Sequence, residues 1–158
     1  MHQPIDSKSN LFLLLDITRV SRSEFEHRVQ DAALGITPSE ARTLSNIARF
    51  GPLNQNELGD LTGFGAMSAT RVLKNLEAAE LVSRSPDPND RRARMVQVTP
   101  KAAPLLTALK DVADEVEAVA RGKMSSKDWR SLQRMLGTAQ ENLLTAYRQR
   151  REAEKKSE

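Results

Sequence analysis

The chain has 158 residues, with 24 Lys and Arg against 21 Asp and Glu, so its formal net charge is +3. Because it contains no Cys, disulfides, thiolate metal sites and cysteine redox switches are excluded, and a hydrophobic share of 39% is too high for a disordered chain. A chain of this length forms one domain or one intertwined unit. The longest strictly apolar run, residues 11–15, is too short to span a membrane, so we expect a soluble cytoplasmic protein with no membrane partner.

Two amphipathic helices are predicted before residue 52. Apolar residues at three- and four-residue steps indicate the first over residues 10–34, and Gly35 is placed to end it. The run Thr-Pro-Ser-Glu at 37–40 is a capping box, in which the Thr hydroxyl and the Glu carboxylate satisfy exposed backbone N–H groups, so it opens the second helix. A Gly-Pro pair at 51–52 stops that helix.

A helix-turn-helix pattern follows. Asn54 and Glu57 repeat the capping box for a short helix, in which Leu61 is expected to point inward. A further helix over residues 65–79 is predicted to bury a stripe made of Ala69, Val72, Leu73 and Leu76. Its opposite face offers hydrogen-bond donors suited to a major groove, and the candidates are Ser68, Thr70, Arg71, Lys74 and Asn75. The alternative interpretation is a solvated polar face on an ordinary core helix.

Residues 81–85 and 94–98 have the pattern of two β-strands joined by a connection rich in turn formers. That connection is too long for a tight hairpin and should form an exposed wing, whose arginines suit the narrow, negative minor groove. Asp90 stands two residues before Arg92, near enough to orient its guanidinium. The candidate wing residues are Arg84, Asp90, Arg91, Arg92 and Arg94. The alternative is a surface ion pair with no further role.

Two long helices are predicted after the wing, opened near Thr99 and Ser125 and separated by Gly122. Their apolar residues form seams with a 3.5-residue period, and the charged end from Arg148 onward is expected to fray. These helices and the first one carry more apolar surface than a small winged domain can cover, so we expect a two-fold homodimer; the alternative is a monomeric helical hairpin. The candidate dimerisation residues are Leu11, Leu14, Val116, Leu136 and Leu143.

Four stretches, residues 51–58, 68–77, 81–84 and 86–94, occur in an order that is more specific than any one of them. The chain from residue 35 to 102 thereby resembles the MarR (multiple antibiotic resistance regulator) family of bacterial transcription factors, most specifically in the Asp-Arg-Arg wing followed by Val-Thr-Pro. The resemblance implies a triangular homodimer whose recognition helices enter successive major grooves of a pseudo-palindrome. It places Ser68, Thr70 and Arg71 in the major groove, and Arg92, paired with Asp90, in the minor groove.

The pattern favours no enzyme. His2 and His27 stand alone without metal-ligand spacing, and no phosphate-binding glycine loop or nucleophile elbow occurs. We therefore expect no catalytic residue, no metal and no cofactor. The resemblance implies instead a small organic or anionic effector, held in a crevice between the dimer helices and the winged domain. The candidate crevice residues are Phe12, Leu15, Arg19, Phe50 and Trp129.

The sequence thus predicts a mainly α (α+β) fold, a winged helix-turn-helix flanked by long dimerisation helices. The expected parts are an N-terminal dimerisation helix in residues 1–36, a DNA-binding domain in 37–99, and C-terminal dimerisation helices with a charged tail in 100–158. The predicted function is a sequence-specific regulator that binds double-stranded DNA as a homodimer, namely a ligand-responsive repressor on a pseudo-palindromic operator. The alternatives are a winged-helix protein-interaction module and a non-specific architectural DNA binder.

Overall fold

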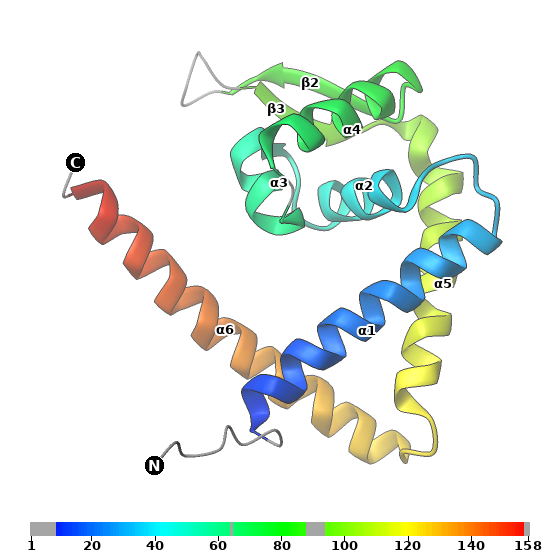
Figure 1. Cartoon of the computed structure of the whole chain (residues 1–158), viewed down its shortest axis with the longest axis vertical. Helices are drawn as coiled ribbons and strands as arrows, with labels where there is room; N and C mark the ends of the chain where they lie inside the picture. The colour runs from blue at the N-terminus through cyan, green and yellow to red at the C-terminus, as the bar shows by residue number, and fades with distance from the viewer. Residues whose placement is uncertain (1–8, 64, 88–93, 157–158) are drawn as a thin grey trace, which may run out of the picture. The chain divides into compact units, whose positions relative to one another are not determined.

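The computed structural model describes residues 9–63, 65–87 and 94–156. The chain divides into two compact units, residues 1–117 and 118–158. The first unit holds the elements α1 (Asn10–Asp31), α2 (Pro38–Phe50), β1 (Leu53–Asn54), α3 (Gln55–Thr62), α4 (Ala66–Ala78), β2 (Val82–Pro86), β3 (Arg94–Val98), the short 3-10 turn Pro100–Ala102 and most of α5 (Ala103–Arg121) (Figure 1). The second unit holds the end of α5 and the long helix α6 (Ser126–Lys156).

Both predicted capping boxes are confirmed. The Thr37 hydroxyl accepts a hydrogen bond from the Glu40 N–H at 3.2 Å, and the Glu40 carboxylate accepts one from the Thr37 N–H at 2.9 Å. At the start of α3, the Asn54 side chain accepts from the Glu57 N–H at 3.0 Å, and the Glu57 carboxylate accepts from the Asn54 N–H at 2.8 Å. Since the first N–H groups of a helix have no partner inside the helix, these side chains fix where α2 and α3 begin.

The core of the first unit lies between α2, α3, α4 and the sheet. Leu44 of α2 and Leu73 of α4 are completely buried, and the stripe predicted for α4 is confirmed. The prediction for Leu61 is wrong, because its side chain is 43% exposed. Thr62 is buried in its place and donates a hydrogen bond to the Leu58 carbonyl at 2.8 Å. The reason is helical geometry: at 3.6 residues per turn, a residue four positions on lies closest above Leu58.

The sheet has three antiparallel strands in the order β1-β3-β2. The two long strands are those predicted for the wing, with Val82 opposite Val98 and Arg84 opposite Val96. The strand β1 was not predicted, because two residues carry no alternating pattern. It pairs Leu53 with Val96 and so joins the wing to the start of α3.

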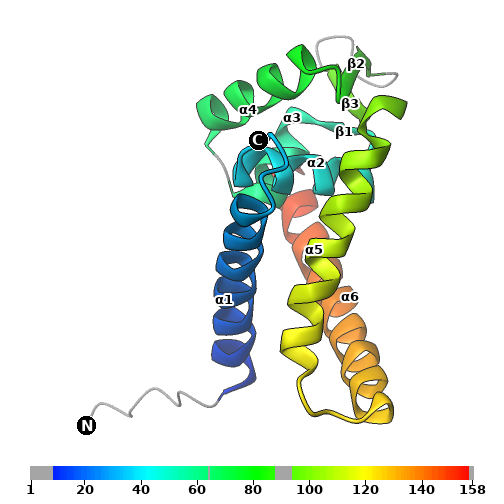
Figure 2. The same cartoon turned by 90° about the vertical axis from the view of Figure 1, so that its right-hand side faces the viewer.

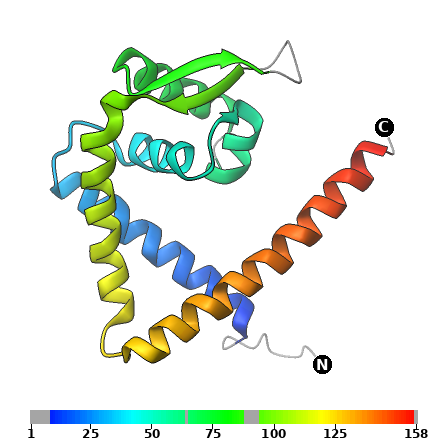
Figure 3. The same cartoon turned by 180° about the vertical axis from the view of Figure 1, so that it is seen from behind.

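Several helix ends differ from the prediction. α1 ends at Asp31, three residues before the predicted end, and Ala33 adopts a left-handed conformation with a φ of 48°. α2 ends where expected, at Phe50, because Pro52 has no N–H to continue the helix and favours the extended conformation seen at Gly51. α6 continues as one helix to Lys156, beyond the point where fraying was expected (Figure 3). Within that end, Arg150 pairs with Glu154 one turn on, a contact that supports an exposed helix.

Among the described residues, no helix combines the length and the apolar character needed to cross a membrane.

Candidate nucleic-acid interface

The helix α4 turns its buried stripe toward the core and its polar face toward solvent. Figure 2 shows α4 lying over α2 and α3, with the hairpin beside it. All five residues predicted on this face are exposed: Ser68, Thr70, Arg71, Lys74 and Asn75. The structure therefore brings these five together on one surface, and two of them are cations.

The first turn of α4 has an unusual surface. Its N-cap residue, Gly65, has no side chain to bond the first N–H groups of the helix. Met67 follows and is 89% exposed. Met67 was not among the candidate residues predicted for this face, because a methionine there carries no signal for a function. This end of the exposed face thus presents a large apolar side chain beside uncapped backbone donors.

Three polar contacts hold α4 to three different elements. The Gln55 amide of α3 donates to the Thr70 hydroxyl at 2.8 Å. The Asn75 amide donates to the Glu40 carboxylate of α2, also at 2.8 Å. The Arg84 guanidinium of β2 pairs with the Glu77 carboxylate at 3.1 Å. The exposed face of α4 is thereby fixed along its length.

Gln55 and Glu40 were not predicted to take part in the site. Both stand in capping-box stretches, and the part of Glu40 in starting α2 already explained that residue. The only signal for a part in the site was position, because each residue stands in the first turn of a helix that precedes α4.

Glu40 is the most buried acid among the described residues, 8% exposed. Burial raises the pKa of its carboxyl, but the hydrogen bonds from the Thr37 backbone and the Asn75 amide, with the charge of Arg71, lower the pKa further than burial raises it. Glu40 is therefore held ionised in the folded protein. Its negative charge lies beneath the cationic face. The carboxylate accepts hydrogen bonds from the start of α2, at Thr37, and from α4, at Asn75.

The wing residues are described only in part. Arg84 lies half-buried on β2 in its pair with Glu77, and Arg94 is exposed at the start of β3. Asp90, Arg91 and Arg92 lie outside the described residues.

The candidate crevice residues are divided between the two units. Phe12, Leu15 and Arg19 follow one another at three- and four-residue steps along α1, so they share a face, and all three are exposed. Phe50 ends α2, 45% exposed, with the Arg49 guanidinium 4.7 Å from the centre of its ring. Trp129 is half-buried on α6, in the second unit.

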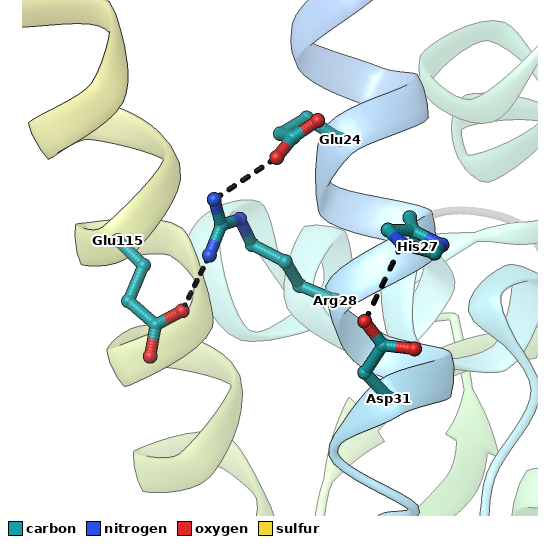
Figure 4. Close-up of polar contacts among 5 residues, drawn as sticks. All are labelled: Glu24, His27, Arg28, Asp31 and Glu115. Carbon is teal, nitrogen blue, oxygen red and sulfur yellow. Dashed lines mark hydrogen bonds and ion pairs between the residues drawn. The ribbon is translucent and has the colours of Figure 1, made fainter.

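A charged cluster not predicted from the sequence joins α1 to α5 (Figure 4). Arg28 donates to Glu115 at 2.8 Å and to Glu24 at 2.9 Å, while His27 lies 3.4 Å from Asp31. The hydrogen bond to Glu115 is the largest cause of the raised pKa of Arg28, opposed by burial and aided by Glu24. The Glu24–Arg28 spacing of four residues was visible in the sequence, but the long-range partner was not.

The candidate dimerisation residues differ in exposure. Leu11 is 62% exposed, Leu143 is 66% exposed and Leu136 is 40% exposed, whereas Leu14 and Val116 are half-buried. Neighbouring apolar side chains on α1 and α6 are exposed as well, among them Leu15, Ile17 and Leu144. Within the described parts of the chain, no group of three or more His, Asp or Glu side chains is placed to hold a metal ion.

A short helix, a turn through the left-handed Gly63, an exposed polar helix and a β-hairpin at its side together define the winged helix-turn-helix class. A model described as the MarR family matches residues 34–93. The chain is also similar to the uncharacterized HTH-type transcriptional regulator YcgE of Bacillus subtilis (strain 168), with 32% identity over 124 residues that cover 68% of this chain and 77% of that protein.

Two solved structures share the fold. One is a putative MarR family transcriptional regulator from Listeria monocytogenes in complex with 26mer DNA, with a TM-score of 0.67, 21% identity, and coverage of 86% of this chain and 89% of that one. The other is Bordetella bronchiseptica BpsR, whose structure concerns regulation of DNA binding by 6-hydroxynicotinic acid, with a TM-score of 0.63, 19% identity, and coverage of 87% and 97%. The chain belongs to the MarR family of transcriptional regulators.

Proposed function

We propose that this regulator binds a pseudo-palindromic operator in double-stranded DNA as a homodimer and represses transcription by occluding the promoter. The observation that carries the proposal is the exposed face of α4. It presents Ser68, Thr70, Arg71 and Lys74 on a helix long enough for a major groove. The Arg71 guanidinium can bond a guanine edge through two parallel hydrogen bonds, and Lys74 can neutralise a phosphate.

The wing supplies the second contact. Arg94 is exposed at its base, and the sequence predicts that Arg91 and Arg92 belong to the wing, with Asp90 to orient Arg92. An arginine inserted into a minor groove reads its width rather than its bases. Arg84 is held by Glu77 and is better suited to fix the base of the wing than to reach DNA.

Two copies are needed to read a palindrome. The exposed leucines Leu11, Leu136 and Leu143 lie on helices outside the winged domain, where burial against a second copy removes apolar surface from water. A two-fold dimer also sets two recognition helices about one DNA turn, ~34 Å, apart. On this proposal residues 1–36 and 100–158 serve dimerisation, residues 37–99 serve DNA binding, and the protein works in the cytoplasm.

An organic or anionic effector would act on the same dimer. The face of α1 with Phe12, Leu15 and Arg19, together with Phe50 of α2, combines apolar surface with a cation, as an aromatic acid requires. The regulation of BpsR by 6-hydroxynicotinic acid is a precedent in the same fold. Such a ligand releases DNA only if it binds the DNA-incompetent state more tightly than the competent one.

The test is selection of genomic DNA fragments on the purified protein, followed by titration of the best fragment against a scrambled duplex at physiological salt. Specific binding should exceed non-specific binding by at least about 10³-fold. An enriched pseudo-palindrome is the expected result. Equal binding to every duplex would indicate an architectural binder, and no binding at that salt would indicate a protein-interaction module.

A further inference from the structure

The Glu40 carboxylate bonds two separate helices with its two oxygens. Oε2 accepts the Thr37 N–H and completes the capping box of α2, whereas Oε1 accepts the Asn75 amide of α4. The side chain is 8% exposed, and a buried carboxylate is tolerated only where hydrogen bonds replace its lost water. The same residue that starts α2 therefore holds α4 against it.

Asn75 shares the exposed face of α4 with Arg71, one helical turn before it. Its amide donor, however, is turned inward and bound to Glu40. A residue whose donor is committed to a buried carboxylate would leave that carboxylate unsatisfied if it turned to a base instead. Asn75 thus differs from its neighbours on this face, although the sequence pattern gave it the same role.

We propose that Glu40 and Asn75 form a positioning pair, which sets the rotation of α4 on α2 and so the direction in which Arg71 and Thr70 meet the DNA. The inference rests on the proposed function, since it concerns how the reading face is aimed. Asn75 fixes the orientation of that face through its hydrogen bond to Glu40. Glu40 therefore affects DNA binding only through Asn75.

The charge of Arg71 supports the same geometry. Arg71 is near enough to Glu40 to lower the pKa of its carboxyl. Asn75 and Arg71 therefore both interact with one buried negative charge. Rotation of α4 would separate this charge from both partners. The pair therefore stabilises one orientation of the helix.

The test reverses the polarity of the hydrogen bond. Asn75→Asp places two carboxylates face to face, and it should lower the ratio of specific to scrambled-duplex affinity about tenfold, as expected for loss of a hydrogen bond to a charged group. Adding Glu40→Gln restores the contact with donor and acceptor exchanged, because the Gln amide donates to the new Asp. The double variant has the wild-type net charge and should recover the affinity ratio. If Asn75 instead contacted a base directly, the double variant would still lack that contact and the affinity ratio would not recover.

Glu40→Gln alone should change the ratio of specific to scrambled-duplex affinity only slightly. The Asn75 amide can rotate so that its oxygen accepts a hydrogen bond from the Gln amide. Asn56→Asp, which adds the same charge on an exposed position of α3, is the matched control for electrostatic repulsion of DNA. It should weaken binding to all duplexes while leaving the affinity ratio unchanged.

Amide hydrogen exchange of the full chain without DNA separates this inference from the proposed function. Exchange along α4 should rise in Asn75→Asp and return in the double variant, while exchange in α1 stays unchanged. If Asn75→Asp does not fold, recovery of folded protein in the double variant is the same result. Unchanged α4 exchange in Asn75→Asp, or a double variant no better than Asn75→Asp, overturns the pair. A wild type without sequence preference overturns the proposed function, and the exchange data still decide whether the pair holds α4.

Discussion

The Gln55 amide donates a hydrogen bond to the Thr70 hydroxyl at 2.8 Å, so the two helices of the helix-turn-helix are joined by their side chains as well as by their buried leucines. Gln55 stands at the first position of α3, directly after the cap Asn54. This hydrogen bond therefore fixes the position of the start of α3 relative to the exposed face of α4. A shift of either helix moves the surface that is proposed to read DNA.

Arg71 and Lys74 should differ in what they contribute. Arg71→Ala is expected to cost about 1–3 kcal/mol of specific binding and to relax preference at one base pair, because its guanidinium can bond a base edge. Lys74→Ala should weaken binding to all duplexes similarly and lower the salt slope by about one. Titrations against single-base variants of the operator at two salt concentrations measure both. Uniform weakening by Arg71→Ala would instead make it a phosphate contact.

Arg92 tests the wing. Arg92→Ala should weaken DNA binding and reduce the salt slope by about one, if the guanidinium neutralises the backbone of a minor groove. Arg92→Lys keeps the charge but loses the planar guanidinium, so it should retain the salt slope and recover only part of the affinity. Equal affinity of the wild type and the alanine variant would remove Arg92 from the interface.

Dimerisation is expected to depend on α6. Leu143 is 66% exposed in one copy, and Leu143→Arg would place a charge in an apolar interface, where it has no partner. Sedimentation should show a shift from dimer to monomer. Thr145→Arg adds the same charge two residues further on, near the opposite face of the helix, and should leave the dimer intact. Loss of the dimer in both variants would point to general damage to α6.

The core of the first unit should be sensitive at Leu44. Its side chain is completely buried, so Leu44→Ala should lower the free energy of unfolding by about 2–5 kcal/mol through lost apolar contact and the cavity that remains. Leu61→Ala removes the same atoms from a side chain that is 43% exposed and should cost clearly less. Urea unfolding followed by circular dichroism measures the difference, and equal costs would contradict the assigned burial.

The lowered pKa of Glu40 predicts a dependence of stability on pH. Burial raises the pKa, but hydrogen bonds from Thr37 and Asn75 and the charge of Arg71 lower it below the ordinary glutamate value. The stabilisation is therefore present above the pKa of the unfolded chain and is lost as pH falls through the lower pKa of the folded protein. The difference in urea midpoint between wild type and Glu40→Gln should shrink over that acidic range. A constant difference would contradict the shift.

The sequence predicts the winged domain well because its signals are local. Capping boxes at Thr37 and Asn54 mark helix starts, and the stripe from Ala69 to Leu76 has a clear helical period. Contacts between distant residues are absent from such patterns. Arg28 and Glu115 stand 87 positions apart, and nothing in either local sequence pairs them.

The candidate site shows the same division. Periodicity placed five polar residues on one face of α4, and all five are exposed. It could not separate Asn75, which is bound to Glu40, from Lys74 beside it, because a hydrogen bond to another helix leaves no trace in the spacing. The strand β1 was missed for a related reason, since two residues show no alternation and only the pairing with β3 defines them.

Asn54 connects the sheet to the helix-turn-helix. Its backbone pairs with Met95 of β3, and its side chain caps α3. A hairpin fastened in this way cannot swing on its own, because the base of the wing and the entry to the helix-turn-helix share one residue. Each DNA-binding domain should then travel as a single body. An effector that releases the operator would have to alter the separation between two such bodies, and a linker inserted between the wing and α5 should be tolerated better than one inserted at Asn54.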